Sequence, residues 1–264
     1  MSKERFSWRV FLVLLALGLV GALAIIPIGI ELFQIIADKL PPPEGPLSAL
    51  PLPLIILIGA LQNILLLAFI ILAGLWCARR LGLGAVLVEA WVKGERVWPR
   101  LRAMLVPSIL AGASIGVILT IALFFLRARI PNLPFTLVTR IALWKRVLLC
   151  FHGGIYEELL TRLFLLSLFA WLLSLLKRKG EGLPGAGVLW TANILSAILF
   201  GLGHLPSASF FISITPLAVV AAIMLNGIAG VTFGYLYCKR GLEAAMIAHF
   251  TADFIIYVVG ASFA

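Results

Sequence analysis

Seven long apolar segments dominate the sequence, and few folds can contain them. An α-helix rises about 1.5 Å per residue, so each segment is long enough to cross most or all of a hydrocarbon core of about 30 Å. Only helices and closed barrels satisfy their backbone hydrogen bonds in lipid, and apolar runs of this length are typical of helices. We expect spans at about residues 10–36, 52–77, 104–126, 155–176, 187–204, 212–238 and 243–261.

The composition supports a membrane protein. Hydrophobic residues make up 62% of the chain and charged residues 12%, whereas a soluble domain has about half apolar and about a quarter charged residues. We find no internal repeat and no soluble segment of domain size. The sequence therefore predicts an all-α, polytopic membrane helical bundle of about seven to eight transmembrane helices, forming one integral-membrane domain over residues 1–264.

The net charge of +10 comes from Lys and Arg residues that flank the apolar segments. Cytoplasmic loops and anionic lipid headgroups favour such positions, so membrane lipids are expected partners. With a cytoplasmic N-terminus, 14 of the 21 Lys and Arg residues lie on the cytoplasmic side, six lie outside and Arg162 lies within the membrane. Nucleic-acid binding is not expected, because no basic stretch is interleaved with exposed aromatic residues. The compact chain fits a multi-pass protein of a prokaryotic cell membrane.

Three connecting regions are harder to assign. The prolines in residues 41–46 predict a stiff connector, because consecutive prolines favour extended chain over helix. Residues 79–102 are basic with interspersed tryptophans, which predicts an amphipathic helix on the cytoplasmic face that Pro99 ends or kinks. Residues 127–152 predict an interfacial or partly re-entrant helix ending at His152-Gly153-Gly154, and a full additional span is the alternative.

Residues 153–162 place three ionisable side chains between apolar runs. An ionisable group in lipid is costly unless it is paired or faces a cavity, so such a group is a functional candidate. Glu158 and Arg162 are four residues apart, share a helix face and can form a carboxylate–guanidinium pair. Glu157 points about 100° away from Glu158 and can face another helix. The two glycines before them suggest a helix that begins inside the membrane.

Further polar residues lie in the spans that follow. Phe200 and His204 are one helical turn apart, as are His249 and Asp253, so Asp253 can accept a hydrogen bond from a ring nitrogen of His249. Asn193 lies eleven residues before His204 on the same face, where it could support the histidine or form a helix–helix hydrogen bond.

We expect these groups to meet in one buried, wet intramembrane cavity. A carboxylate and an imidazole on either side of a water can share its proton, and a second histidine can donate to an oxyanion. This chemistry is hydrolysis by an activated water. His152 matches no such spacing, and we expect an interfacial or structural role for it.

Three motifs occur in a fixed order: Glu157-Glu158-x-x-x-Arg162, Phe200-x-x-x-His204 and His249-x-x-x-Asp253. In this order they resemble the motifs of the CPBP intramembrane protease family, also called the ABI family. That family includes CaaX prenyl endopeptidases and bacteriocin-processing and immunity proteins. The resemblance covers about residues 150–255, which we interpret as the motif-bearing catalytic core.

The resemblance implies a role for each motif residue. Glu157 and His204 would activate the water, Glu158 and Arg162 would support Glu157, and His249 with the residue at position 253 would form the oxyanion hole. Many members have asparagine at that last position. Since an ionised carboxylate cannot donate, we expect Asp253 to orient His249 instead.

Zinc is a possible cofactor, because members of the family have also been called metalloproteases. Its ligands would be Glu157, His204, His249 and Asp253, whose oxygen and nitrogen atoms zinc accepts. The zinc-protease motif His-Glu-x-x-His is absent from the sequence. Three cysteines without Cys-x-x-Cys spacing indicate neither a disulfide framework nor a thiolate metal site.

The function expected from these residues is an intramembrane endopeptidase of the CaaX type. Its substrate would be a membrane-associated protein or peptide, possibly prenylated or carrying a leader peptide. One alternative is a proton-coupled membrane transporter, because buried carboxylates and histidines also line proton relays. Another is a non-catalytic membrane scaffold or immunity protein.

Overall fold

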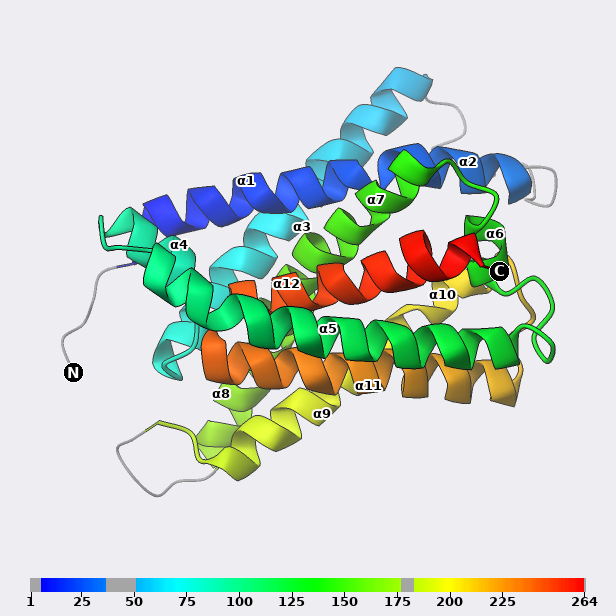
Figure 1. The fold of residues 1–264 in the computed structure, drawn as a ribbon. Coiled ribbons are helices and arrows are strands. Elements are labelled where there is room, and N and C mark those ends of the chain that lie inside the picture. Colours follow the sequence, from blue (N-terminus) through cyan, green and yellow to red (C-terminus); the bar gives the residue numbers. More distant parts are fainter. Residues whose placement is uncertain (1–5, 37–50, 177–182, 264) are drawn as a thin grey trace.

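The computed structural model describes residues 6–36, 51–176 and 183–263, and all regular structure in these ranges is helical (Figure 1). Seven helical runs are long and apolar enough to cross a membrane, which confirms the polytopic helical bundle. They are Trp8–Gln34, Pro53–Arg80, Trp98–Leu126, Leu143–Leu176, Ala186–Ala208, Pro216–Arg240 and Leu242–Ser262. The predicted proline connector at 41–46 lies outside the described residues.

Some spans comprise more than one helical element. The first three spans and their connections contain α1 (Trp8–Ala24), α2 (Ile26–Ile36), α3 (Leu52–Arg80), α4 (Val86–Val92), α5 (Trp98–Leu126) and α6 (Pro134–Val138). The fourth span contains α7 (Leu143–Phe151), the π-helices η3 (His152–Glu157) and η4 (Leu159–Leu166), and α8 (Ser167–Leu176). The last three contain α9 (Ala186–Gly203), α10 (Leu205–Ala208), α11 (Pro216–Arg240), α12 (Leu242–Asp253), the π-helix η5 (Phe254–Val259) and the 3₁₀-helix η6 (Gly260–Ser262).

The spans run alternately up and down, so the bundle has two ends. At the N-terminal end, on the left in Figure 1, α1, α5, α9 and α12 begin and α3, α8 and α11 end. The short helix α4 also lies at this end. At the C-terminal end, on the right, α5 and α9 finish and α11 starts, close to the C-terminus of the chain.

Small residues bring α9 and α11 together. A Cβ atom added at Gly230 would lie 2.8 Å from the Cβ of Ala197, closer than side chains normally approach. Asn193 on α9 donates to the backbone carbonyl of Val231 on α11 at 2.9 Å. Small residues at helix interfaces let backbones pack closely in membranes, so Gly230 serves helix packing.

The fourth span is one continuous helical run, and the expected helix end at Gly153 and Gly154 is wrong. The run starts at Leu143, twelve residues before the predicted start of the span, and reaches Leu176. Residues 143–152 therefore belong to a full span and not to a re-entrant helix. The π-helical geometry lies in its middle, and such wide turns occur frequently at functional sites.

The predicted amphipathic helix over 79–102 is shorter than expected. Only α4 lies between the second and third spans, and Pro99 stands in the first turn of α5 instead of ending a helix. A proline is tolerated there because its missing N–H has no partner within the helix anyway. Trp91 and Trp98 are 63% and 65% exposed, as interfacial tryptophans would be.

The first turn of α4 is held by a carboxylate from the start of α12. One oxygen of Glu243, Oε1, accepts hydrogen bonds from the backbone amides of Leu87 and Val88, both at 2.9 Å. The amide of Leu242 donates to the carbonyl of Gly84 at 3.0 Å. Since α12 carries His249 and Asp253, α4 is tied directly to the helix that bears the third motif.

Replacing Glu243 with alanine is expected to lower the free energy of unfolding by about 1–3 kcal/mol, because two partly buried amides lose their acceptor. Thermal unfolding of the purified protein in micelles measures this change. Glu243→Gln keeps a carbonyl oxygen at the same position and is the matched control, with a smaller expected loss. An equal loss in both variants would show that the oxygen is not what holds α4.

Candidate active site

The three motifs meet in the middle of the bundle. Glu157 and Glu158 stand where η3 passes into η4, Arg162 lies in η4, His204 follows α9, and His249 and Asp253 lie on α12. The Nε2 atom of His249 is 3.7 Å from Oε2 of Glu157. The rings of Phe200 and His249 have their centroids 5.9 Å apart. Residues from three spans thus form one cluster.

The two adjacent glutamates have different environments. The side chain of Glu157 is 24% exposed, whereas that of Glu158 is completely buried. Successive residues on a helix point about 100° apart, which separates the two carboxylates. Only Glu157 is accessible to a water or substrate, and Glu158 faces the interior.

Arg162 connects the buried glutamate to neighbouring helices. Its guanidinium Nε is 3.3 Å from Oε2 of Glu158, a charge pair without hydrogen-bond alignment. Its Nη2 donates to the carbonyl of Gly230 on α11 at 3.1 Å. The aromatic rings of Phe200 and Phe233 lie 5.3 Å and 5.8 Å from the guanidinium carbon, within cation–π range. The side chain of Arg162, which is 1% exposed, therefore contacts one carboxylate, one carbonyl and two aromatic rings.

His249 is oriented by Glu158 and not by Asp253. Its Nδ1 donates to Oε1 of Glu158 at 2.8 Å, a contact across 91 positions of the sequence. Its Nε2 is 3.6 Å from the Asp253 carboxylate, too far for a hydrogen bond. The prediction that Asp253 accepts this bond is wrong, although Asp253 remains close to the ring. Phe233 stacks on His249 at 4.8 Å and holds the ring plane.

His204 presents one nitrogen to the cluster. Its Nδ1 lies 2.7 Å from the carbonyl of Phe200, and because a carbonyl only accepts, Nδ1 carries the proton. Nε2 of the neutral ring then has its lone pair available. His204 and Glu157 are close enough to interact electrostatically. This arrangement suits a water held between an imidazole and a carboxylate.

His152 lies beside Glu157, which the sequence did not predict. Its Nδ1 donates to the carbonyl of Gly21 on α1 at 3.0 Å, and its Nε2 is 3.8 Å from Oε1 of Glu157. In an α-helix, residues five apart point about 140° away from one another. In a π-helix the turns are wider and the hydrogen bonds join residues five apart, which brings His152 and Glu157 nearer to one face. The contact between His152 and Glu157 depends on the wide turns of η3, so α-helical spacing does not predict it.

Comparison with known proteins bears on the same region. Residues 139–255 match the family model described as type II CAAX prenyl endopeptidase Rce1-like. Over these residues the chain is similar to the Rce1-like family. The matched segment includes all three motifs, agrees with the CPBP resemblance and supports an intramembrane protease. Comparisons with curated proteins and with solved structures found no match.

The matched segment begins at Thr139 and ends at residue 255, so it contains the fourth, fifth and sixth spans and most of the seventh, and α1 to α6 lie outside it. Two of these outer helices nevertheless contact the site. Gly21 on α1 binds His152, and Asn63 on α3 lies 3.5 Å from the hydroxyl of Tyr156. The predicted catalytic core at 150–255 remains a prediction as a structural unit.

The expected zinc ligands, Glu157, His204, His249 and Asp253, are not grouped around one point in the described part of the chain. Within the ranges that the structure describes, no three His, Cys, Asp or Glu side chains form a group with metal-binding geometry. Nδ1 of His249 is engaged by Glu158, and Nδ1 of His204 by a carbonyl, so only Nε2 of each ring is open to a ligand. We therefore assign no step to a metal.

The expected wet cavity around the cluster of motif residues remains a prediction. Cavities of about 260, 460 and 60 Å³ are lined by residues nearer the N-terminal end of the bundle. Asn193 lines the smallest of them, and its hydrogen bond to Val231 joins two helices. The structure thus gives Asn193 a packing contact, and its predicted support of His204 remains untested.

Gly153 and Gly154 allow the fourth span to approach α12. A Cβ atom at Gly153 would collide with the carboxylate of Asp253 and lie 3.1 Å from Nε2 of His249. At Gly154 it would lie 2.9 Å from the Cβ of Phe250 and 3.1 Å from the carbonyl oxygen of Met246. The two glycines therefore provide close packing, in place of the helix start that the sequence suggested.

Alanine at these two glycines is expected to have different effects. Gly154→Ala meets α12 backbone atoms and should lower the free energy of unfolding by about 1–3 kcal/mol. Gly153→Ala displaces only the movable end of Asp253, so stability should change by less than about 1 kcal/mol, while cleavage falls about 10- to 100-fold. Thermal unfolding measures the stability of each variant, and peptide cleavage measures its activity. Unchanged cleavage by Gly153→Ala would show that the position of the Asp253 carboxylate is unimportant.

Proposed function

We propose that the protein is an intramembrane endopeptidase in which Glu157 and His204 activate a water that attacks a peptide carbonyl. The observation that carries this proposal is the difference between the two adjacent glutamates. Glu157 is accessible and lies among histidines, whereas Glu158 is buried between Arg162 and His249. A purely structural ion pair with Arg162 would need only the buried carboxylate of Glu158.

In the proposed reaction, Glu157 removes a proton from water while His204 Nε2 holds the same water through its lone pair. The water oxygen bonds to the carbonyl carbon, and the carbonyl oxygen becomes an oxyanion. The carbon–nitrogen bond then breaks as Glu157 returns the proton to the leaving nitrogen. The products are a carboxylic acid and an amine, and Glu157 is regenerated.

His249 is the proposed donor to the oxyanion. Its Nδ1 is fixed by Glu158, which leaves Nε2 directed toward Glu157 and Asp253 at 3.7 Å and 3.6 Å. In the proposed state His249 is an imidazolium with a proton on both nitrogens, so Nε2 can donate to the oxygen that gains charge, which stabilises the transition state more than the bound substrate. Arg162 acts indirectly by holding Glu158.

The proposed substrate is a membrane-associated protein or peptide. The description of the matching family favours a prenylated, CaaX-type C-terminus as the first class to test. A leader peptide is the second class, because bacteriocin-processing proteins belong to the wider family that the motifs resemble. An active site within the spans suits either substrate, since both are delivered by the membrane.

The proposed location is a prokaryotic cell membrane, with the N-terminal end of the bundle in the cytoplasm. The excess of Lys and Arg at that end supports this orientation. A cysteine introduced by Arg96→Cys, in a chain without its native cysteines, should react with a membrane-impermeant reagent only in opened cells. Reaction in intact cells would reverse the orientation.

Cleavage by purified protein tests the proposed function. Wild type, Glu157→Ala and His204→Ala are incubated with prenylated, leader and transmembrane peptide pools, with and without a chelator, and the products are identified by mass spectrometry. We expect both substitutions to abolish cleavage. Glu31→Ala, which removes a carboxylate paired with Lys145 outside the cluster, is the control and should remain active. Undiminished cleavage by both site variants would refute the assignment.

A further inference from the structure

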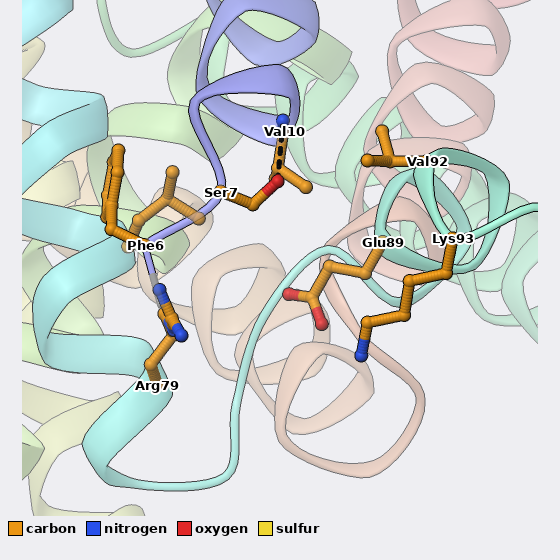
Figure 2. A pocket seen from close by; sticks show the side chains of 8 residues that line it. Phe6, Ser7, Val10, Arg79, Glu89, Val92 and Lys93 are labelled. Atoms are coloured by element: carbon orange, nitrogen blue, oxygen red, sulfur yellow. Dashed lines mark hydrogen bonds between the residues drawn. The ribbon is translucent and has the colours of Figure 1, made fainter. Parts of the chain in front are cut away.

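A cavity of about 260 Å³ lies at the N-terminal end of the bundle, between the start of α1, the end of α3 and α4 (Figure 2). Its lining is amphipathic. Phe6, Val10, Leu75 and Val92 supply apolar surface. Arg79 comes from α3, whereas Glu89 and Lys93 come from α4, and Figure 2 shows the Glu89 carboxylate directed into the space between these helices.

A second cavity of about 460 Å³ lies on the other side of α4, against α5 and the end of α11. Glu89 and Lys93 line both cavities, so α4 separates two parts of one region. The second cavity adds Arg100, Lys239 and Arg240. We call the two together the α4 site.

The α4 site has an excess of positive charge. Five cationic side chains line it, against the carboxylates of Glu89 and Glu95. Glu95 is paired with Arg100 at 2.6 Å, and Arg240 donates to the carbonyl of Ala103 at 3.0 Å. Lys93 and Lys239 are exposed side chains that reach solvent. The charge of the site is therefore complementary to an anion.

The α4 site lies at the depth of the lipid headgroups. Six of the seven tryptophans belong to the N-terminal end of the bundle, and tryptophan concentrates at the membrane–water interface. They are Trp8, Trp76, Trp91, Trp98, Trp171 and Trp190. Trp91 on α4 and Trp98 at the start of α5 are among the most exposed. An anion at this depth with apolar surface beside it is typical of a phospholipid.

We propose that the α4 site binds the phosphate-bearing headgroup of an anionic membrane phospholipid. Arg79 and Lys93 contact the phosphate, and the glycerol and first acyl carbons lie against Val10, Leu75 and Val92. Arginine and lysine are the usual partners of phosphate. The first cavity, of about 260 Å³, is slightly below the usual range for a whole drug-sized ligand, which suits a headgroup whose acyl chains remain in the bilayer.

A few direct contacts connect the α4 site to α12, the helix that carries the third motif. Glu243 binds the first turn of α4, and a Cβ atom at Gly241 would lie 2.6 Å from a methyl group of Val86. A headgroup held by α1, α3 and α4 therefore restrains the start of α12. His249 lies about two helical turns further along that helix.

Lipid binding to the full-length, delipidated protein tests the proposal. Phosphatidylglycerol and phosphatidylcholine with identical acyl chains are titrated into the protein in micelles, and bound lipid is measured by native mass spectrometry. We expect phosphatidylglycerol to bind at least about tenfold more tightly. Arg79→Gln with Lys93→Gln should remove this preference, whereas Arg96→Gln with Arg140→Gln, which removes two exposed cations outside the site, should retain it.

Two further measurements test the proposal even if Arg79→Gln with Lys93→Gln folds poorly. Arg79→Lys with Lys93→Arg preserves both charges and should retain at least about a third of the affinity. Inorganic phosphate at a hundredfold excess should not displace phosphatidylglycerol, because the apolar wall adds no affinity for the free ion. Equal binding of the two lipids, equal loss in the control pair, or full displacement by phosphate would each overturn the proposal.

A cleavage assay adds a readout that rests on the proposed function. Phosphatidylglycerol should raise the rate of peptide cleavage by wild type and leave that of Arg79→Gln with Lys93→Gln unchanged. Because lipid binding is measured separately, an inactive protein that still binds phosphatidylglycerol selectively supports the lipid site and refutes only the protease.

Discussion

Replacing Glu157 with glutamine is expected to lower kcat/KM for peptide cleavage about 100- to 10,000-fold, the usual contribution of a general base. Glutamine has the shape of glutamate but cannot take a proton from water. The side chain is 24% exposed and has no hydrogen bond that folding depends on among those described, so the free energy of unfolding should change by less than about 1 kcal/mol. Cleavage kinetics and thermal unfolding of the same preparation measure both quantities.

The adjacent carboxylate is the matched control for this prediction. Glu158→Gln makes the same chemical change one residue later, but it neutralises a buried partner of Arg162 and His249. Both activity and stability should therefore fall in Glu158→Gln. If Glu157→Gln cleaved at the wild-type rate, or if the two variants behaved alike in both measurements, the division of roles between the two glutamates would be wrong.

Replacing Arg162 with methionine is expected to lower the free energy of unfolding by about 3–5 kcal/mol. The guanidinium is 1% exposed, and its loss leaves the Glu158 carboxylate buried without its countercharge. The carbonyl of Gly230 also loses its side-chain donor. Methionine has a similar length, so little of the change comes from an empty cavity.

A double-mutant cycle isolates the charge pair within that loss. Glu158→Gln with Arg162→Met removes both charges, so this double variant should be more stable than Arg162→Met alone. Unfolding in mixed micelles measures all four proteins under one condition. Additive effects of the two substitutions would mean that Glu158 and Arg162 do not stabilise one another.

The local pairs of the site could be predicted because they repeat at helical spacing. Glu158 with Arg162 is four residues apart, as is Phe200 with His204, and each pair lies together in the structure. Apolar length alone was enough to locate the seven spans, although the fourth begins earlier than expected. These features depend on neighbours along one helix, which a sequence displays directly.

Contacts between distant spans could not be predicted in the same way. The bond from His249 to Glu158 joins residues 91 positions apart, and the nearer Asp253 was the natural choice from spacing alone. Gly153 and Gly154 were interpreted as a helix end because their role depends on Phe250 and other residues of α12. Which helix packs against which is a tertiary property that no spacing along the chain contains.

The π-helical stretch of the fourth span makes the number of residues there part of the site. Between His152 and Leu166 the backbone contains wide turns, and the two carboxylates lie in the middle. Deleting a residue from a wide turn restores ordinary α-helical geometry there, in which residues five apart point about 140° away from one another. Substitutions can vary the chemistry of this segment, but a change in its length would take His152 off the face that carries Glu157. Evolution along this stretch is therefore expected to proceed by exchange of side chains and not by insertion or deletion.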